Sequence, residues 1–149
     1  IPGLAGLSEM CEARGMRLVR VYGRMEMDLA ALSPEEQAEF MADLHVEETG
    51  RRRLISKAFG LLGLESFFTV GPAEVRAWTL KTGATAVEAA GTIHSDLARG
   101  FIRAQVVPYG EFMKHGASFP ACRDAGVLRL EGKEYPVRDG DILEIRFNV

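Results

Sequence analysis

The chain has 149 residues, of which 47% are hydrophobic and 26% charged. These fractions match an average globular protein, so a packed core is expected and bulk disorder is excluded. The formal net charge of −3 excludes a protein that coats nucleic acid through overall positive charge, although local basic faces remain compatible with it. Two cysteines, no signal-peptide pattern and no apolar run of about 18 residues predict a cytoplasmic protein with free thiols and no membrane partner.

The first 22 residues combine one helical pattern with one strand pattern. Apolar residues at helical spacing predict a helix over residues 1–14, which Gly15 ends. Residues 16–22 are rich in branched and aromatic side chains and predict a strand. A helix followed by a strand is typical of one crossover of an α/β domain. We therefore expect the chain to be cut from a larger protein and to self-associate through apolar faces of residues 1–21.

Two more helices follow before the character of the sequence changes. Ser33 and Glu36 form a capping box, which predicts a helix over residues 34–44. Residues 51–62 place an apolar stripe opposite a basic cluster and end at Gly63. The basic cluster comprises Arg51, Arg52, Arg53 and Lys57. We favour the interpretation that it is the solvated side of the helix, and contact with phosphates is the alternative.

From residue 65 onward, short strands and turns predominate. Strands are predicted over residues 65–70 and 74–80, and the capping box of Thr85 and Glu88 predicts a helix ending near Gly100. A strand over residues 101–107 precedes an irregular segment with one or two short helices.

The last part of the chain carries hairpin and turn signals. Residues 127–130 and 135–137 flank a predicted hairpin turn, and a final strand occupies residues 142–149. In the turn before it, Gly140 supplies a positive φ and Asp139 is expected to bond the following amides. The whole order predicts an α+β fold in which one helix half-covers a sheet, as in a β-grasp, with a domain boundary between residues 64 and 65.

Several sequence runs carry a family resemblance. EVRAWTLKTGATAVEAAGTIHSDLARGFIRAQVVPY (74–109) and EGKEYPVRDGDILEIRFNV (131–149) resemble the TGS domain of YchF/Obg-like ATPases. Upstream, LSPEEQAEFMADL, EETG and FFTVG occur in the order found in that family. The resemblance implies that residues 65–149 form a ubiquitin-like TGS β-grasp. It also implies that residues 1–64 are the mainly helical end of an α/β P-loop nucleotide-binding domain.

The resemblance implies a ribosome-associated enzyme that hydrolyses ATP or GTP with Mg²⁺. No Gly-x-x-x-x-Gly-Lys-Ser/Thr motif occurs in this sequence, so the chain alone is expected to bind no nucleotide, cofactor or metal and to have no catalytic residues. The family's Ser-Ala pair, whose backbone touches the nucleotide base, is replaced here by Tyr22 and Gly23. These two residues are therefore the expected base contact within a full-length parent protein.

A partner surface is expected on the second half of the chain. An aromatic residue with cations on a strand suits base stacking and phosphate neutralisation, although a lone tryptophan is more often packed. At the end of the predicted helix, an Asp–Arg pair with Gly100 as a left-handed cap is the simpler interpretation of the polar cluster. The expected surface comprises Arg76, Trp78, Lys81, His94, Asp96, Arg99 and Arg103.

Two functions follow from this surface. In the first, the chain is a regulatory and docking region whose TGS domain contacts ribosomal RNA or a ribosomal protein. In the second, the β-grasp docks on the parent nucleotide-binding domain and restrains its hydrolysis.

Overall fold

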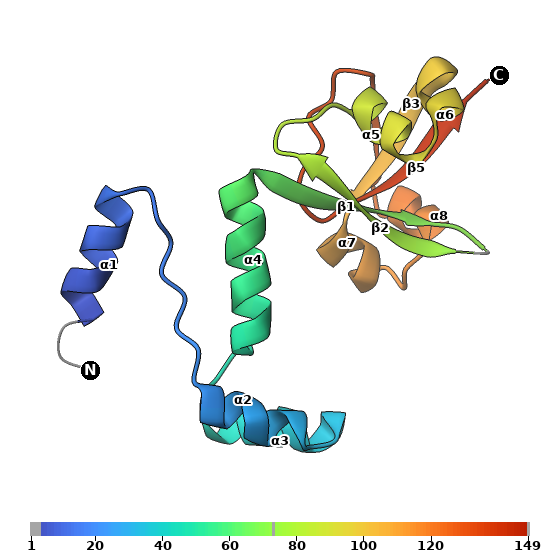
Figure 1. Ribbon diagram of the computed structural model, residues 1–149. Coiled ribbons are helices and arrows are strands. Elements are labelled where there is room, and N and C mark those ends of the chain that lie inside the picture. Colours follow the sequence, from blue (N-terminus) through green and yellow to red (C-terminus); the bar gives the residue numbers. More distant parts are fainter. Residues whose placement is uncertain (1–3, 73, 149) are drawn as a thin grey trace. The chain divides into compact units, whose positions relative to one another are not determined.

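The computed structural model describes residues 4–72 and 74–148 (Figure 1). The chain divides into two compact units, Ile1–Leu62 and Gly63–Val149, and each is described by itself. The first unit is helical and the second contains a sheet. Among the described residues, no helix is long and apolar enough to cross a membrane. The helices of the first unit are α1 (Leu4–Ala13), α2 (Gly23–Ala30), α3 (Pro34–Asp43) and α4 (Gly50–Leu62).

Local capping signals account for α3 and α4. The Ser33 amide donates to the Glu36 carboxylate at 2.8 Å, and the Glu36 amide donates to Ser33 Oγ at 3.4 Å, so the predicted capping box is confirmed. These bonds lower the pKa of Glu36, because they favour the ionised carboxylate. The helix α4 ends at Gly63, whose φ of 59° is a left-handed conformation that glycine adopts without strain. Both helices lie where the sequence predicts them.

The predicted strand over residues 16–22 is wrong. These residues contain no regular secondary structure, and α2 begins directly after them at Gly23. A strand needs a neighbour to accept and donate its backbone hydrogen bonds, and no strand is present among the described residues of this unit. The short helix α2 was not predicted from the sequence, and its Leu29 is 3% exposed.

The second unit is a mixed five-stranded sheet with helices on both sides, so the predicted α+β class is confirmed. The strand order is β2-β1-β5-β3-β4; β1 and β5 are parallel and the other neighbours are antiparallel. The helices α5 and α6 lie on one side of the sheet, and α7 and α8 lie on the opposite side (Figure 1). The strands are β1 (Leu64–Val70), β2 (Val75–Lys81), β3 (Phe101–Pro108), β4 (Arg129–Glu131) and β5 (Asp141–Phe147). The helices are α5 (Ala86–Ile93), α6 (Ser95–Arg99), α7 (Tyr109–Lys114) and α8 (Phe119–Asp124).

Alternation along the strands produces two separate apolar clusters. Phe67 and Leu143 point to the α5 side, where they pack with the buried alanines of α5. Ile142 points to the other side and packs with Phe112 of α7 and Cys122 of α8. We call these two sides of the sheet the α5 face and the α8 face. Burial raises the pKa of the Cys122 thiol, so this cysteine behaves as a small core residue.

The predicted helix over residues 85–100 is interrupted. It begins at the predicted capping box, where the amide of Thr85 donates to Glu88 at 2.7 Å. His94 then adopts an extended conformation, with φ of −163°, and separates α5 from α6. The imidazole Nδ1 of His94 accepts from the amide of Asp96 at 3.2 Å and so caps the second helix. Helical periodicity alone did not predict this break, because the imidazole replaces the usual Ser or Asp cap.

Gly100 is not the left-handed cap that the sequence predicted. Its φ is −91°, a conformation open to any residue. Glycine is required for another reason: the backbone of Asn148 lies too close to leave room for a side chain at this position. The Gly100 carbonyl accepts from the Asn148 amide at 2.9 Å.

The predicted hairpin over residues 127–137 is also wrong. The strand β4 pairs with β3, and residues 135–137 form no strand; Pro136 makes one isolated bridge with Thr85. Proline lacks the amide hydrogen that a hairpin ladder needs at this position. The segment instead crosses to the start of α5, where the Tyr135 carbonyl accepts from the Ala86 amide at 2.9 Å.

A buried polar network fixes the loop between β4 and β5. Asp141 is 2% exposed and accepts from the Tyr135 hydroxyl at 2.8 Å and from the Arg138 amide at 3.0 Å. Burial and the bond to Asp141 together raise the pKa of Tyr135. The predicted role of Asp139 is wrong: its carboxylate accepts from the amide of Ser66 at 2.8 Å instead, across 73 positions of sequence. Gly140 has the expected positive φ, 81°.

Candidate functional site

The first unit contains a pocket beside the expected base contact. Its volume is about 430 Å³, and Tyr22 is one of its lining residues. Tyr22 immediately precedes α2, is 54% exposed, and makes no side-chain cap bond to that helix. An aromatic ring at the wall of an open pocket can stack on a planar ligand. The other lining residues are Leu18, Arg20, Met25, His45, Val46, Glu47, Glu48 and Arg53.

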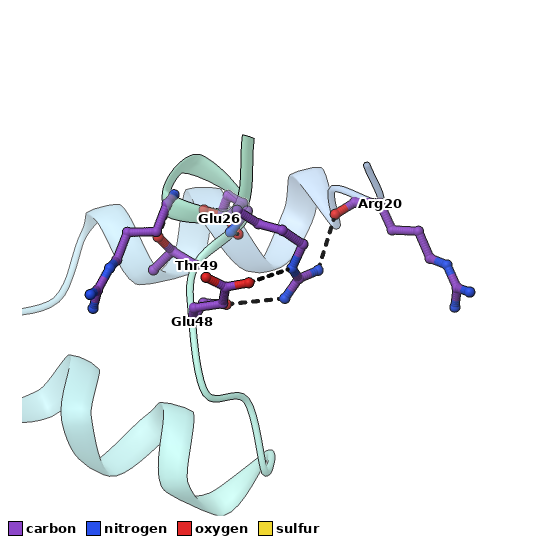
Figure 2. Close-up of polar contacts among 7 residues, drawn as sticks. Arg20, Glu26, Glu48 and Thr49 are labelled. Carbon is purple, nitrogen blue, oxygen red and sulfur yellow. Dashed lines mark hydrogen bonds and ion pairs between the residues drawn. The ribbon is translucent and has the colours of Figure 1, made fainter. Parts of the chain in front are cut away.

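Polar contacts between distant segments hold this pocket together (Figure 2). The Arg53 guanidinium donates to the Glu48 carboxylate at 3.1 Å and to the backbone carbonyl of Arg20 at 3.2 Å. From α2, the Glu26 carboxylate accepts from the Gly50 amide at 2.6 Å, at the start of α4. The segment that carries Tyr22 is therefore tied to α4 by bonds that span 33 and 24 positions of sequence.

Replacing Glu26 with alanine is expected to loosen the start of α4. Its carboxylate satisfies an amide that has no partner within its own helix, and losing such a cap costs about 1 kcal/mol. Hydrogen exchange of the Gly50 amide should accelerate by about fivefold in Glu26→Ala. Glu39→Ala is the matched control, because Glu39 is an exposed glutamate of α3. Equal exchange rates in both variants would show that Glu26 does not stabilise α4.

The expected partner surface of the second unit falls into three groups. Arg76 and Trp78 form the first group on β2, where the guanidinium carbon lies 4.1 Å from the ring centroid. The indole is half-buried, stacks on Phe67 and donates to the Thr69 hydroxyl at 3.0 Å. Trp78 is therefore partly a core residue, and its ring lies beneath an exposed cation on the α5 face.

The second group lies on the α8 face. Lys81 is opposite Leu64 in the β1–β2 ladder, and Arg103 is opposite Arg146 in the β3–β5 ladder. Phe68 of β1 is the partner of Ile142 of β5 in the sheet. Because side chains alternate between the two faces along each strand, counting from this pair places both cations on the same face. Arg103 therefore lies on the opposite side of the sheet from Trp78.

The third group lies at α6. Asp96 forms the predicted ion pair with Arg99, and its carboxylate lies 3.6 Å from Nδ1 of the His94 imidazole. Of the simpler interpretation of this cluster, the Asp–Arg pair within the helix is present, whereas the left-handed cap at Gly100 is not.

Three residues near Arg103 were missed from the sequence. Arg146 lies directly opposite Arg103, and Gln105 and Arg123 lie beside them on the α8 face. Alternation within the last strand places Arg146 on one face with Ile142. Its partner on β3 depends on the register between strands that are far apart in sequence.

Comparisons with known proteins place the chain among related sequences. Residues 64–148 match the family model YchF-GTPase_C, described as a protein of unknown function (DUF933). The chain is 45% identical over 148 residues to the protein of Haemophilus influenzae named "Ribosome-binding ATPase YchF", and 43% identical over 146 residues to the protein of that name from Bacillus subtilis. Each alignment covers at least 98% of this chain but 40% of the relative, so the chain spans less than half the length of these proteins.

Solved structures agree with these sequence relationships. A YchF GTPase of Schizosaccharomyces pombe superposes with a TM-score of 0.76 at 29% identity, covering 96% of this chain and 38% of the other. A GTP-binding protein of Pyrococcus horikoshii has the same fold, with a TM-score of 0.64 at 19% identity, covering 97% of this chain and 41% of the other. Among the described residues, no group of three or more His, Cys, Asp or Glu side chains could hold a metal ion.

Proposed function

Because the chain belongs to the YchF family, we propose that it is the docking and regulatory region of a ribosome-associated, nucleotide-hydrolysing protein of the cytoplasm. The names of the bacterial relatives support ribosome binding and ATP hydrolysis. Their greater length supports a parent protein whose ATP or GTP site, with Mg²⁺, lies largely outside this chain.

The second unit is proposed to be a TGS-type β-grasp. The strand order β2-β1-β5-β3-β4, with a parallel pair β1–β5 and a helix crossing between β2 and β3, supports this assignment. In the first unit, the pocket beside Tyr22 supports a role for Tyr22 and Gly23 at the base of the nucleotide, as part of the parent nucleotide-binding domain.

The observation that carries the docking proposal is the pair Arg76 and Trp78. Arg76 is 53% exposed by its side chain and lies over the indole, at the outer strand of the sheet. A cation held over an aromatic ring presents charge to phosphates and a flat surface to bases. Ribosomal RNA offers both, and a ribosomal protein offers acidic side chains to the same cation.

Reversing the charge of Arg76 is expected to weaken ribosome association. Co-sedimentation of the full-length protein with ribosomes should fall about tenfold in Arg76→Glu, because one charge-assisted contact contributes about 1.5–3 kcal/mol. Co-sedimentation of Trp78→Ala should fall by a similar factor, but this substitution also removes a core contact with Phe67. Arg76→Glu therefore carries the test, with Lys133→Glu as an exposed control of equal charge change.

Two results would contradict docking through this pair. Undiminished sedimentation of both variants would remove the pair from the proposed surface. If Arg76→Glu left sedimentation unchanged but raised basal ATP hydrolysis, the alternative function would be supported, in which this module restrains the parent nucleotide-binding domain.

A further inference from the structure

The outer side of β2 is an open strand edge of the second unit. β2 is the border strand of the sheet, and the described part of the chain supplies no strand beyond it. Five of its seven residues are exposed, so nothing covers most of its length. The opposite border strand, β4, has only three residues and offers much less backbone. A long uncovered border strand presents backbone donors and acceptors in the geometry that another strand needs.

The register of the β1–β2 ladder shows which backbone groups point outward. The Gly71 amide donates to the Glu74 carbonyl at 2.9 Å, and the Thr82 amide donates to the Gly63 carbonyl at 2.9 Å. In an antiparallel ladder, hydrogen-bonded pairs alternate with pairs whose amides and carbonyls point away from the partner strand. Counting inward from either bond, the even-numbered residues of β2 bond to β1 and the odd-numbered residues point outward.

Three successive odd-numbered residues, Val75, Ala77 and Thr79, carry the outward groups. Each contributes one amide and one carbonyl that have no backbone partner within the described residues. The row ends at Lys81, whose carbonyl already accepts from the Ala84 amide at 3.0 Å. An extended peptide of about five residues is long enough to pair with the whole row.

The two faces beside this edge differ in their chemistry. On the α5 face, the exposed Arg76 makes only a 3.9 Å ion pair with the exposed Glu74, so its guanidinium stays accessible. On the α8 face, Val75 is 71% exposed and Ala77 is exposed as well. Side chains alternate along an extended peptide, so one set would lie beside Arg76 and the other beside Val75 and Ala77. Acidic residues suit the first set and branched apolar residues the second.

We propose that β2 binds an extended segment of a partner protein, in which acidic and branched apolar residues alternate, as a sixth strand of the sheet. The phosphates of a nucleic acid could accept from the outward amides but would leave the outward carbonyls without donors. The β2 strand of a second copy would bring more cations to an edge that already carries Arg76 and Lys81. The inference goes beyond the docking function, because it rests on the backbone of β2 as well as on one side chain.

The direct test uses a fluorescein-labelled peptide of alternating glutamate and valine, and measures its binding to the full-length protein by fluorescence anisotropy. An alternating lysine and valine peptide should bind about tenfold more weakly or worse, because it places like charges beside Arg76. Equal affinity for the two peptides would overturn the proposed choice of partner.

Methylated peptides test the backbone pairing without changing the protein. One version carries methyl groups on the valine nitrogens, and its matched control carries them on the glutamate nitrogens. Only one of these two sets of amides faces β2: the valine set if the peptide is antiparallel to β2, and the glutamate set if it is parallel. That version should bind about fivefold more weakly than the other, because its donors are lost. Equal affinities of the two versions would refute strand addition.

A proline at position 77 tests the same edge from the protein side. Ala77→Pro removes an outward amide, and proline is tolerated where a border strand points its amide to solvent. Peptide affinity should fall about tenfold relative to Ala77→Val, the control that keeps the amide. Urea unfolding checks the fold, and if Ala77→Pro is clearly less stable, Val75→Pro replaces it, because the first residue of a strand accepts proline. Equal peptide affinities of the proline variant and its control would show that the edge is not the binding site.

Hydrogen exchange locates the bound peptide. In the free protein, the amides of Ala77 and Thr79 should exchange faster than those of Trp78 and Leu80, which bond to β1. Saturating peptide should slow the first two amides about tenfold or more, since each gains a hydrogen bond. Unchanged exchange at Ala77 would mean that the peptide binds elsewhere, contrary to the proposal.

Ribosome sedimentation separates this proposal from the docking function. Docking through Arg76 and Trp78 fails if Arg76→Glu sediments with ribosomes as the wild type does. Strand addition fails if Ala77→Pro, which keeps both of those side chains, binds peptide as well as Ala77→Val. If light scattering shows a dimer of the wild type that Ala77→Pro abolishes, the edge serves a second copy and the peptide proposal is wrong.

Discussion

Replacing Phe67 with alanine should destabilise the second unit by about 3–5 kcal/mol, the range measured for removal of large buried side chains. Phe67 is fully buried on β1, in the cluster beneath α5, and its ring stacks on Trp78 at 6.4 Å. Truncation would leave a cavity in this cluster between the sheet and α5. Since whole domains are stable by about 5–15 kcal/mol, the loss is a large share of the total.

Urea unfolding followed by circular dichroism measures this effect, and the fluorescence of Trp78, the sole tryptophan, reports on the same unit. Phe147→Ala removes the same atoms from a side chain that is 47% exposed at the end of β5, so it should cost about 1 kcal/mol. Similar losses in the two variants would mean that the cluster beneath α5 does not depend on Phe67.

The second large effect is expected for Gly100→Ala, which should destabilise the second unit by about 2–3 kcal/mol. A Cβ at this position would collide with the carbonyl oxygen of Asn148 and lie 2.9 Å from its carbonyl carbon. Both contacts are to backbone, so no side-chain rotation relieves them. The end of β5 would have to separate from β3, and the amide of Asn148 would lose its bond to Gly100.

Gly91→Ala provides a control with the opposite sign. A Cβ at Gly91 would lie 3.5 Å from the Cβ of Ala98, an ordinary contact, and the residue is exposed within α5. Alanine in a helix interior is favoured over glycine by about 0.5–1 kcal/mol, so this variant should be slightly more stable. Urea unfolding and hydrogen exchange of the Asn148 amide distinguish Gly91→Ala from Gly100→Ala. A Gly100→Ala protein as stable as the wild type would refute the close approach of the Asn148 backbone to Gly100.

Features that depend on a few neighbouring residues were predicted well. The capping boxes at Ser33 and Thr85 are confirmed, because each involves side chains and amides only three positions apart. These same contacts lower the pKa of Glu88, since the Thr85 amide donates to its ionised form. The end of α4 at Gly63 and most strands followed from equally local patterns.

Features that depend on distant partners were predicted poorly. Residues 16–22 have the composition of a strand, but composition cannot supply the neighbouring strand that a ladder needs. Residues 127–130 were expected to pair with 135–137, whereas β4 pairs with β3. The bridge from Asp139 to Ser66 spans 73 positions and has no local signal.

The candidate sites show the same division. Tyr22 and Gly23 were chosen through family resemblance, and their role at a nucleotide base stays a prediction. Arg103 was also chosen from sequence, but its counterpart Arg146 appears only once the register of β3 and β5 is known.

The two outermost strands of the sheet have a consequence for behaviour at high concentration. One border is β4, with three residues, and the other is β2, which presents Arg76 and Lys81 on its opposite sides. Short or cationic border strands resist the strand-to-strand joining that begins amyloid growth. The sheet can therefore keep broad faces available for partners while its rims oppose polymerisation with copies of itself.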